Sequence, residues 1–430
     1  MTRIALLAHR HRPAASSRSL GRWRGRSLTG LLSAIALTIT ALPTLAQDDA
    51  LRLDDWAAIE RAAKGQTVYW NAWGGDSRTN AYLAWAADTL EARHDIELVH
   101  VKLDDTGTAV SRVIAEKAAG NLDEGAIDLI WINGENFAAM KDNDLLFGPF
   151  AEALPNHDLT RPETNPEVRL DFTVPTEGFE APWGKAQLTF YYDSARLETP
   201  PGSIPALLDW ARAHPGRFTY PLVPDFTGST FLKQALIELA TDTAPLYEPA
   251  AQSDFAAVTA PLWDYLDALH PHLWRDGRHF PASGPEMRRL MGDGELSLAF
   301  TFIPSEPAAA VADFQLPPTT RSYVLDGGTL GNVHFVAIPF NSSHKAGALV
   351  TANFLLSPEA QAKKLDPAVW GDRTVLDMAA LDEAARATFI DDRDNPAALP
   401  ADALSKTRPE PHPSWMARLE ATWLERYGSQ

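Results

Sequence analysis

Residues 68–103 read VYWNAWGGDSRTNAYLAWAADTLEARHDIELVHVKL, and this stretch decides the fold. Its two ends, Val68–Trp73 and Ile96–Leu103, are rich in aromatic and β-branched residues, as β-strands are. Between them, apolar residues recur at spacings of three and four from Tyr82 to Leu90, which places one apolar stripe on a helix. The stretch therefore predicts a strand, a helix that covers the sheet, and a second strand.

The loop after the first predicted strand is a candidate binding edge. Gly74 and Gly75 leave room close to the backbone, and Asp76 or Ser77 caps the helix that follows. The N-terminus of such a helix presents unsatisfied N–H groups at the carboxyl end of the strand. We therefore expect this loop to contact a ligand.

The pattern repeats further along the chain. A helix is predicted around Val110–Ala118 and a third strand over Ile127–Ile132, and the turn Asn133–Asn136 leads into another helix. Alternating strands and helices at this spacing indicate a parallel sheet. Loops that follow parallel strands open on one edge, so Asn133–Asn136 is expected on the same edge as Gly74–Asp76.

The first 46 residues differ in kind from the rest. They carry seven arginines and no acidic residue, and the apolar run Leu28–Leu42 is followed by small residues that end at Ala46. This order is typical of a secretory signal peptide, with cleavage after Ala46 or within a few residues of it. The apolar run has about fifteen residues, fewer than the roughly 20 that a membrane-spanning helix needs.

The predicted mature chain is strongly acidic. Removing residues 1–46 lowers the basic count from 38 to 31 against 56 acidic residues, which leaves a net charge of −25. Such a surface repels nucleic acid and anionic lipid, so neither is expected as a partner. The chain has no cysteine, and hence neither a disulfide nor an amino-terminal Cys for a lipid anchor. We expect a protein that is free in the periplasm and is not a lipoprotein.

The length of 430 residues argues for two lobes, because it exceeds what one core usually holds. A second strand-loop-helix edge is predicted downstream, where Asp225–Ser229 precedes a helix from Phe231 to Ala240. A strand over Leu296–Phe302 follows. The second half of the chain therefore holds another candidate binding edge.

A family resemblance is carried by residues 331–364, GNVHFVAIPFNSSHKAGALVTANFLLSPEAQAKK. This stretch resembles the late segment of bacterial extracellular solute-binding proteins of ABC importers, and Asn353–Gln361 is fairly specific to that family. The motifs YWNAWGG and DLIWINGENF are most similar to the YnjB-type subgroup, relatives of the thiamine, polyamine and ferric-iron binders. An adjacent tyrosine pair occurs only at Tyr191–Tyr192, in the first crossing strand, which argues against a ferric site.

The resemblance implies an α/β fold of the type II periplasmic-binding-protein kind. Each lobe would hold a mixed, mainly parallel sheet flanked by helices, with the ligand cleft between the lobes. The implied segments are 47–187 in lobe 1, 188–301 in lobe 2, 302–340 returning to lobe 1, and 341–430 in lobe 2 with the C-terminal helices. The hinge is expected near Gln187–Tyr191 and Thr301–Pro304.

The resemblance also places ligand contacts on the loops after strands and at the first crossing. The candidate residues are Asn71, Trp73, Gly74, Gly75, Asp76, Asn133, Gly134, Glu135, Asn136, Trp183, Lys185, Asp225, Thr227, Gly228, Ser229, Glu306, Asp326, Thr329 and Asn332. Each of these residues can instead serve as an ordinary helix cap or turn residue. Trp73 and Trp183 adjoin glycine loops and are expected in the cleft, whereas Trp70 and Trp131 are expected in the core.

Acids outnumber bases among the candidates. The acids are Asp76, Glu135, Asp225, Glu306 and Asp326, and the bases are Arg78 and Lys185. Together with aromatic faces, which attract cations, this balance favours an organic cation such as thiamine or a polyamine as the cargo. Helix N-termini such as Thr106–Thr108 and Thr227–Ser229 also hold oxyanions, so an oxyanion, a metal ion or a sugar is the alternative cargo.

Motifs that would indicate an enzyme are absent from the sequence. It has no His-Glu-x-x-His, no Gly-x-Ser-x-Gly, no P-loop and no cysteine nucleophile. Gly327–Gly331 imitates a dinucleotide fingerprint without its strand and helix, and the proline inside His270–His272 points the two histidines apart. We expect a monomeric receptor without cofactor or metal that delivers a small solute to an inner-membrane ABC permease. A secreted glycan-active enzyme with a Glu/Asp pair is the remaining alternative.

Overall fold

The computed structural model describes residues 51–390, 395–399, 403 and 406–428. The predicted signal peptide, residues 1–46, lies outside the described residues. Among the helices that are described, none has both the length and the apolar character needed to cross a membrane.

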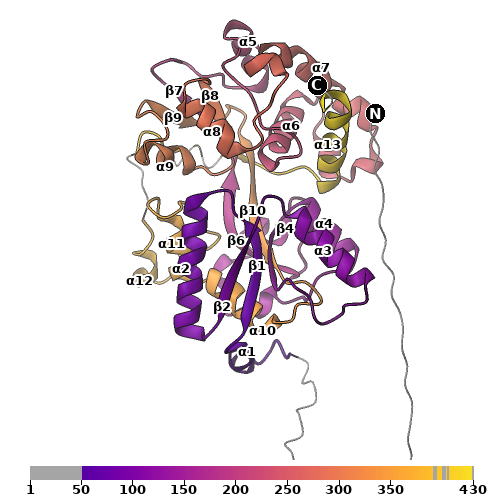
Figure 1. Ribbon diagram of the computed structural model, residues 1–430, viewed down its shortest axis with the longest axis vertical. Coiled ribbons are helices and arrows are strands. Elements are labelled where there is room, and N and C mark those ends of the chain that lie inside the picture. The colour runs from indigo at the N-terminus through magenta and orange to yellow at the C-terminus, as the bar shows by residue number, and fades with distance from the viewer. Residues whose placement is uncertain (1–50, 391–394, 400–402, 404–405, 429–430) are drawn as a thin grey trace, which may run out of the picture. The chain divides into compact units, whose positions relative to one another are not determined.

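Helices and strands alternate along most of the described chain (Figure 1). The α-helices are α1 Trp56–Ala63, α2 Ser77–His94, α3 Gly107–Ala118, α4 Glu135–Asp142, α5 Ile204–Ala213, α6 Phe226–Leu239, α7 Phe255–Leu269, α8 Gly284–Gly292, α9 Glu306–Ala312, α10 Lys345–Leu355, α11 Pro358–Leu365, α12 Glu383–Arg386 and α13 Pro413–Tyr427. The strands are β1 Thr67–Trp73, β2 Glu97–Leu103, β3 Leu129–Ile132, β4 Leu170–Asp171, β5 Val174–Pro175, β6 Glu180–Gln187, β7 Thr189–Asp193, β8 Leu298–Thr301, β9 Thr320–Tyr323, β10 Thr329–Ala337 and β11 Thr407–Arg408.

The first sheet is mixed and has the strand order β11-β10-β3-β1-β2, with β6 also paired to β10. Strands β1 and β2 are parallel, in a register that runs from Thr67 opposite Glu97 to Trp73 opposite Leu103. Strand β3 is parallel to β1, whereas β10 is antiparallel to both β3 and β6. The strand, helix and strand predicted from residues 68–103 are confirmed as β1, α2 and β2.

The second sheet has the order β8-β7-β9. Strand β7 is antiparallel to both of its neighbours. The α/β class is confirmed, but this sheet differs from the mainly parallel pairing that was expected. The reason is that β7 follows β6 directly and is bordered by strands that return from distant helices, so no strand-helix-strand unit sets its direction.

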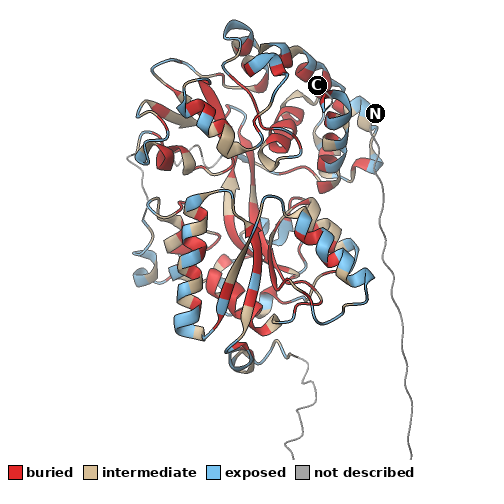
Figure 2. Ribbon diagram, in the orientation of Figure 1, coloured by how far each residue is buried: buried red, intermediate tan, exposed pale blue. Residues whose placement is uncertain are grey.

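Two hydrophobic cores form around these sheets. The first core contains Trp70, Tyr82 and Phe335, and the second contains Phe190, Phe231 and Trp423. Figure 2 shows buried residues along the strands of the first sheet. The chain passes from the first core to the second between β6 and β7, and β10 passes back, because Leu330 packs in the second core and Val333 in the first.

The boundaries between the lobes differ from the sequence expectation. Residues 302–330, expected in lobe 1, contribute Phe302, Leu316 and Leu325 to the second core. Residues 346–381, expected in lobe 2, pack in the first core, where α10 lies against α1. The return crossing is β10 itself, so everything between β7 and β10 belongs to the second core. Helix α10 then buries nearly all of its sides, as its apolar sequence requires.

Candidate functional site

Several helix N-termini meet between the two cores. From the first core come the starts of α2, α3 and α4, which follow β1, β2 and β3 as expected. From the second core come the starts of α6 and α9. Asp76 caps α2 by accepting hydrogen bonds from the backbone N–H groups of Arg78 (2.9 Å) and Thr79 (3.0 Å). Asp225 caps α6 in the same way through Thr227 (3.0 Å) and Gly228 (3.3 Å).

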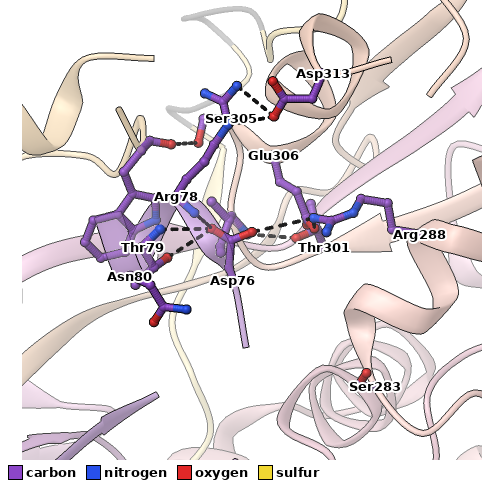
Figure 3. A network of polar contacts seen from close by, with 12 residues as sticks. Asp76, Arg78, Thr79, Asn80, Ser283, Arg288, Thr301, Ser305, Glu306 and Asp313 are labelled. Atoms are coloured by element: carbon purple, nitrogen blue, oxygen red, sulfur yellow. Dashed lines mark hydrogen bonds and ion pairs between the residues drawn. The ribbon is translucent and has the colours of Figure 1, made fainter. Parts of the chain in front are cut away.

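We call the space between the two cores the cleft. On one side of it, charged side chains from the two cores contact one another (Figure 3). Arg288 of α8 pairs with Glu306 at the start of α9, and its guanidinium also lies 3.8 Å from Asp76 Oδ2 in the first core. In the opposite direction, Arg78 of α2 reaches Asp313 of the second core, with Nη2 3.0 Å from Oδ2. We call these five residues the closing network.

Backbone groups complete the closing network. Arg78 Nη1 donates to the carbonyl of Pro367 (2.6 Å), and Ser305 Oγ of the second core donates to the carbonyl of Trp370 (2.9 Å) in the first. The cavity that these residues line measures ≈ 20 Å³. This volume holds about one water molecule. The charged groups here satisfy one another and leave no room for an organic cargo.

Four acidic residues from the two cores are linked by electrostatic interactions in another part of the cleft. Asp105 and Glu135 stand at the starts of α3 and α4 in the first core, and Asp225 and Glu420 belong to α6 and α13 in the second. Burial raises the pKa of Glu135, Asp225 and Glu420, and the charge of Asp105 raises each of these pKa values further. Asp105 therefore lies within electrostatic range of the other three, and Glu420 lies within range of Glu135 as well. We call these four residues the cleft carboxylates.

The contacts of the cleft carboxylates are short and polar. Ser229 Oγ donates to Glu420 Oε1 (2.6 Å), and Asn136 Nδ2 donates to Glu135 Oε1 (3.0 Å). Burial raises the pKa of Glu135 to about 7. Within the described part of the chain, no lysine or arginine forms an ion pair with any cleft carboxylate.

Lys233, the lysine whose charge acts on Glu135, already forms an ion pair with Glu410. Lys233 of α6 opposes the rise in the pKa of Glu135, but its Nζ lies 2.8 Å from Glu410 Oε2 and both side chains are almost fully buried. The ammonium also sits 4.6 Å from the ring centre of Phe172 and 5.5 Å from that of Phe226. Lys233 is thus paired with Glu410, and its charge also opposes the rise in the pKa of Glu135 and of Glu420. One ammonium shared with Glu410 does not balance four carboxylates, so a negative excess remains.

Some predicted site residues belong to the closing network or to the cleft carboxylates, or contact them. Asp76 and Glu306 belong to the closing network, and Glu135 and Asp225 are cleft carboxylates. Ser229 and Asn136 hold the carboxylates by hydrogen bonds. Gly134 has φ +61°, and the backbone N–H of Gly134 donates to both oxygens of buried Asp171 at 2.8 Å. This bond fixes the turn from which Glu135 projects.

Other predicted residues pack closely against neighbouring side chains or backbone. Gly75 lies against the ring of Trp73, Gly74 against the side chain of Lys102, and Gly228 against the backbone of Pro221. Thr227 lies beside Gly284 at the start of α8. Asn71 is buried, Asn133 is half-buried, and neither makes a side-chain hydrogen bond within the described residues.

Four predicted residues lie elsewhere. Lys185 pairs with Glu167 of the first core. Asp326 packs against Gly202, in the second core. Thr329 accepts a hydrogen bond from Gln187 Nε2 (3.3 Å), and Asn332 donates to Glu410 Oε1 (3.1 Å), so both brace the crossing strands. Within the described residues, neither Lys185 nor Asp326 forms an ion pair with the closing network or the cleft carboxylates.

Trp183 is not in the cleft, contrary to the sequence expectation. Its side chain is 0 % exposed and packs against Trp70, Trp131 and Trp370 at ring-centre distances of 4.9 to 5.6 Å. Its carbonyl accepts a hydrogen bond from the buried ammonium of Lys364. A strand residue next to a glycine can face either side of the sheet. The side chain of Trp183 faces the core side, where it packs in the aromatic cluster. Trp70 is in the core, as expected.

Three further residues define the cleft, although no sequence pattern singles them out. Asp105 precedes Gly107 and caps the start of α3, so its sequence context is that of an ordinary capping residue. Arg288 and Glu420 lie inside helices with no local signal, and only the packing of α8 and α13 brings them to the cleft. Within the described residues, no three histidine or acidic side chains are grouped as a metal ion needs.

Comparison with known proteins gives a consistent result. Residues 85–397 match the family model of the bacterial extracellular solute-binding proteins. Protein YnjB of Escherichia coli (strain K12) is 45 % identical over 402 residues, which cover 94 % of this chain and 98 % of YnjB.

Two solved structures show the same fold at low identity. The periplasmic binding protein AfuA from Actinobacillus pleuropneumoniae, with bound fructose-6-phosphate, is similar with a TM-score of 0.59 and 15 % identity over 85 % of this chain and 99 % of AfuA. The spermidine/putrescine transporter substrate-binding protein PotD from Streptococcus pneumoniae has a TM-score of 0.55 and 14 % identity over 85 % of this chain and 99 % of PotD. These likenesses concern the fold alone.

Proposed function

Because this chain belongs to the bacterial extracellular solute-binding proteins, the solute-binding components of ABC importers, we propose that it captures a small organic cation between its two cores. The cation would be held by the cleft carboxylates Asp105, Glu135, Asp225 and Glu420. The solute would then pass to an inner-membrane permease. We also propose that the mature protein is periplasmic, exported by the signal peptide of residues 1–46, and monomeric.

The observation that supports a cation is the unbalanced charge of the cleft carboxylates. Like charges that are brought together raise one another's pKa and disfavour the closed form. A bound cation relieves this repulsion only when the two cores close over it, because two of the carboxylates come from each core. The differential affinity for the closed state that a receptor needs therefore follows from the charges.

The fold by itself does not decide the cargo. Of the two structural neighbours, one is named for spermidine and putrescine, which are cations, and the other holds a sugar phosphate, which is an anion. The choice of cargo therefore depends on the side chains in the cleft. The family consists of binding proteins, and the cleft carboxylates are proposed to bind without chemistry.

The test is a binding screen on the mature chain, residues 47–430. Calorimetric titration and thermal shift would compare putrescine, spermidine, thiamine and choline with phosphate, sulfate, glucose 6-phosphate, glucose and divalent metal ions. A ligand at 100 times its dissociation constant stabilises the fold by about 2.7 kcal/mol, which a thermal shift detects. At least one organic cation is expected to bind, and the anions and neutral sugars are not.

Variants tie the binding to the proposed residues. Glu135→Gln and Glu420→Gln keep the size of the side chains and remove the charges, so each is expected to weaken the cation at least tenfold. Glu91→Gln, on the exposed side of α2, is the matched control. Tight binding of an anion, or cation binding that both cleft variants leave unchanged, would contradict the proposal.

A further inference from the structure

The ammonium of Lys233 is enclosed by groups that proteins use to hold cationic ligands. Its Nζ lies 4.6 Å from the ring centre of Phe172 and 5.5 Å from that of Phe226. Glu410 Oε2 lies 2.8 Å from the same atom, and the side chain of Lys233 is 1 % exposed. Aromatic faces attract an ammonium, and a carboxylate pairs with it. The chain here supplies, from its own helix α6, the cation that such an enclosure binds.

The enclosure is built from both cores. Phe172 lies in the turn between β4 and β5, and its ring is so close to Gly134, before α4 of the first core, that a side chain at Gly134 would lie 2.6 Å from it. The backbone of Phe172 has φ +55°, a conformation that residues other than glycine adopt rarely and at a cost. The carboxylate of neighbouring Asp171 accepts the N–H of Gly134 and holds this turn in place. Phe226 packs in the second core, so each core supplies one ring.

Lys233 also lies beside the cleft carboxylates. Phe226, Ser229 and Lys233 are spaced by three and four residues and therefore share one face of α6. On this face Ser229 Oγ donates to Glu420 Oε1 (2.6 Å). Burial raises the pKa of Glu135 and of Glu420, and the charge of Lys233 opposes the rise in both. The ammonium is thus within electrostatic range of one cleft carboxylate from each core.

We propose that Lys233 determines the charge of the cargo: its ammonium occupies one of two cation places in the cleft, so the solute brings a single cationic centre to the cleft carboxylates. A second ammonium on the solute would lie near Lys233 in a poorly hydrated space, where like charges repel strongly. The inferred class is therefore an organic monocation and not a diamine or polyamine. This inference rests on the proposed function, in which the cargo is an organic cation.

The charge of the cleft fits one added cation. The negative excess is smaller than the number of acids, because burial raises the pKa of Glu135 to about 7 and also raises the pKa of Asp225 and of Glu420. These carboxyls hold part of their protons at neutral pH when no solute is bound. A single cationic centre is then enough to relieve the repulsion between the cores.

A purely structural role for Lys233 is the alternative. Glu410 accepts a hydrogen bond from Asn332 of β10 (3.1 Å), so the ion pair of Lys233 and Glu410 also braces a crossing strand. Bracing alone explains neither the two rings around the ammonium nor its place beside the cleft carboxylates. It predicts that removing the pair lowers stability and leaves the preference among cations unchanged.

The first test compares n-butylammonium with putrescine, which share a four-carbon chain and differ by one ammonium. In calorimetric titration of residues 47–430, wild type should bind n-butylammonium at least tenfold more tightly. The double variant Lys233→Met/Glu410→Gln removes the ammonium together with its partner, so no buried charge is left unpaired. Its preference should shift toward putrescine at least tenfold. Lys64→Met, exposed before β1, is the matched control and should keep the wild-type ratio.

A second test needs no cargo. Lys233→Ala lacks the atoms from Cγ to Nζ, which n-propylammonium replaces. This amine should raise the melting temperature of Lys233→Ala by several degrees more than that of wild type, whereas uncharged 1-propanol should not. The extra shift should disappear in Lys233→Ala/Glu410→Gln, because the enclosure then lacks its carboxylate.

Each outcome decides one point. Equal shifts of Lys233→Ala and wild type with n-propylammonium would show that the enclosure is not a cation place and would overturn the inference. An unchanged ratio of putrescine to n-butylammonium affinity in Lys233→Met/Glu410→Gln would overturn it in favour of the structural role. Rescue of Lys233→Ala by n-propylammonium, combined with no binding of any organic cation to wild type, would support the cation place and refute the proposed function alone.

Discussion

Replacing Glu135 by glutamine is expected to stabilise the unliganded protein at pH 8 and to weaken the binding of a cation. Burial raises the pKa of this carboxyl from 4.5 to about 7, although Lys233 opposes the rise. Each pKa unit corresponds to about 1.4 kcal/mol, so ionisation at high pH costs the folded state up to about 3 kcal/mol. The side chain keeps some contact with solvent, which reduces the expected gain to about 1–3 kcal/mol.

The sign of the pH dependence follows from the direction of the shift. The folded state binds the proton of Glu135 more tightly than the unfolded chain does. Below pH 4.5 the carboxyl is protonated in both states and imposes no penalty, and the penalty grows between pH 4.5 and about 7. The stability gained by Glu135→Gln over wild type should therefore be near zero at pH 4.5 and should level off above pH 7. A cation favours the ionised carboxylate, so the affinity of wild type for it should rise over the same window.

Urea denaturation at pH 4.5, 6 and 8 measures the difference directly, with Glu91→Gln as the control that should follow wild type at every pH. Cation affinity is measured in parallel by calorimetry. A Glu135→Gln variant whose stability tracks wild type from pH 4.5 to 8 would refute the burial of this carboxyl. Unchanged cation affinity in the same variant would refute its place in the binding site.

Three further outcomes are expected. Lys364→Met leaves buried Asp372 without its ammonium partner, 2.7 Å away, and should cost about 3–5 kcal/mol in urea denaturation. Arg78→Gln removes a partly exposed ion pair across the cleft, worth about 0.2–1 kcal/mol, and should raise the open population of the unliganded protein up to about fivefold in single-molecule energy transfer between the cores. Gly134→Ala places a side chain 2.6 Å from the Phe172 ring at φ +61° and should cost about 1–3 kcal/mol in stability and displace Glu135, which a weaker cation affinity would report.

The first sheet could be predicted from the sequence because its signals are local. The apolar stripe of α2 and the β-branched runs of β1 and β2 specify their structures within a few residues of themselves. The second sheet has no such signal. Strand β7 finds its partners β8 and β9 more than a hundred residues away, so their antiparallel direction depends on packing that no short window of sequence contains.

The candidate site divides in the same way. Glu135 and Asp225 begin helices after predicted strands or turns, and the alternation of strands and helices identified them. Glu420 lies in the middle of α13, and it reaches the cleft because α13 packs against α4 and α6. Trp183 shows the converse, since its glycine neighbour suggested a loop while its ring fills the first core. Local patterns identify which residues stand at an edge, but the packing decides which edges meet.

The helix caps bear directly on the choice between an anion and a cation. A helix N-terminus attracts an oxyanion through free N–H groups and the positive end of its dipole. At three of the helices that begin at the cleft, the first N–H groups are already bonded to carboxylates of the protein: Asp76 and Asp225 cap α2 and α6, and Asp105 accepts from the N–H of Gly107 (2.5 Å) at the start of α3. An oxyanion would have to displace these carboxylates and then lie beside them. Each cap neutralises the positive end of a helix, so the remaining field in the cleft is that of the carboxylates, and it favours a cation.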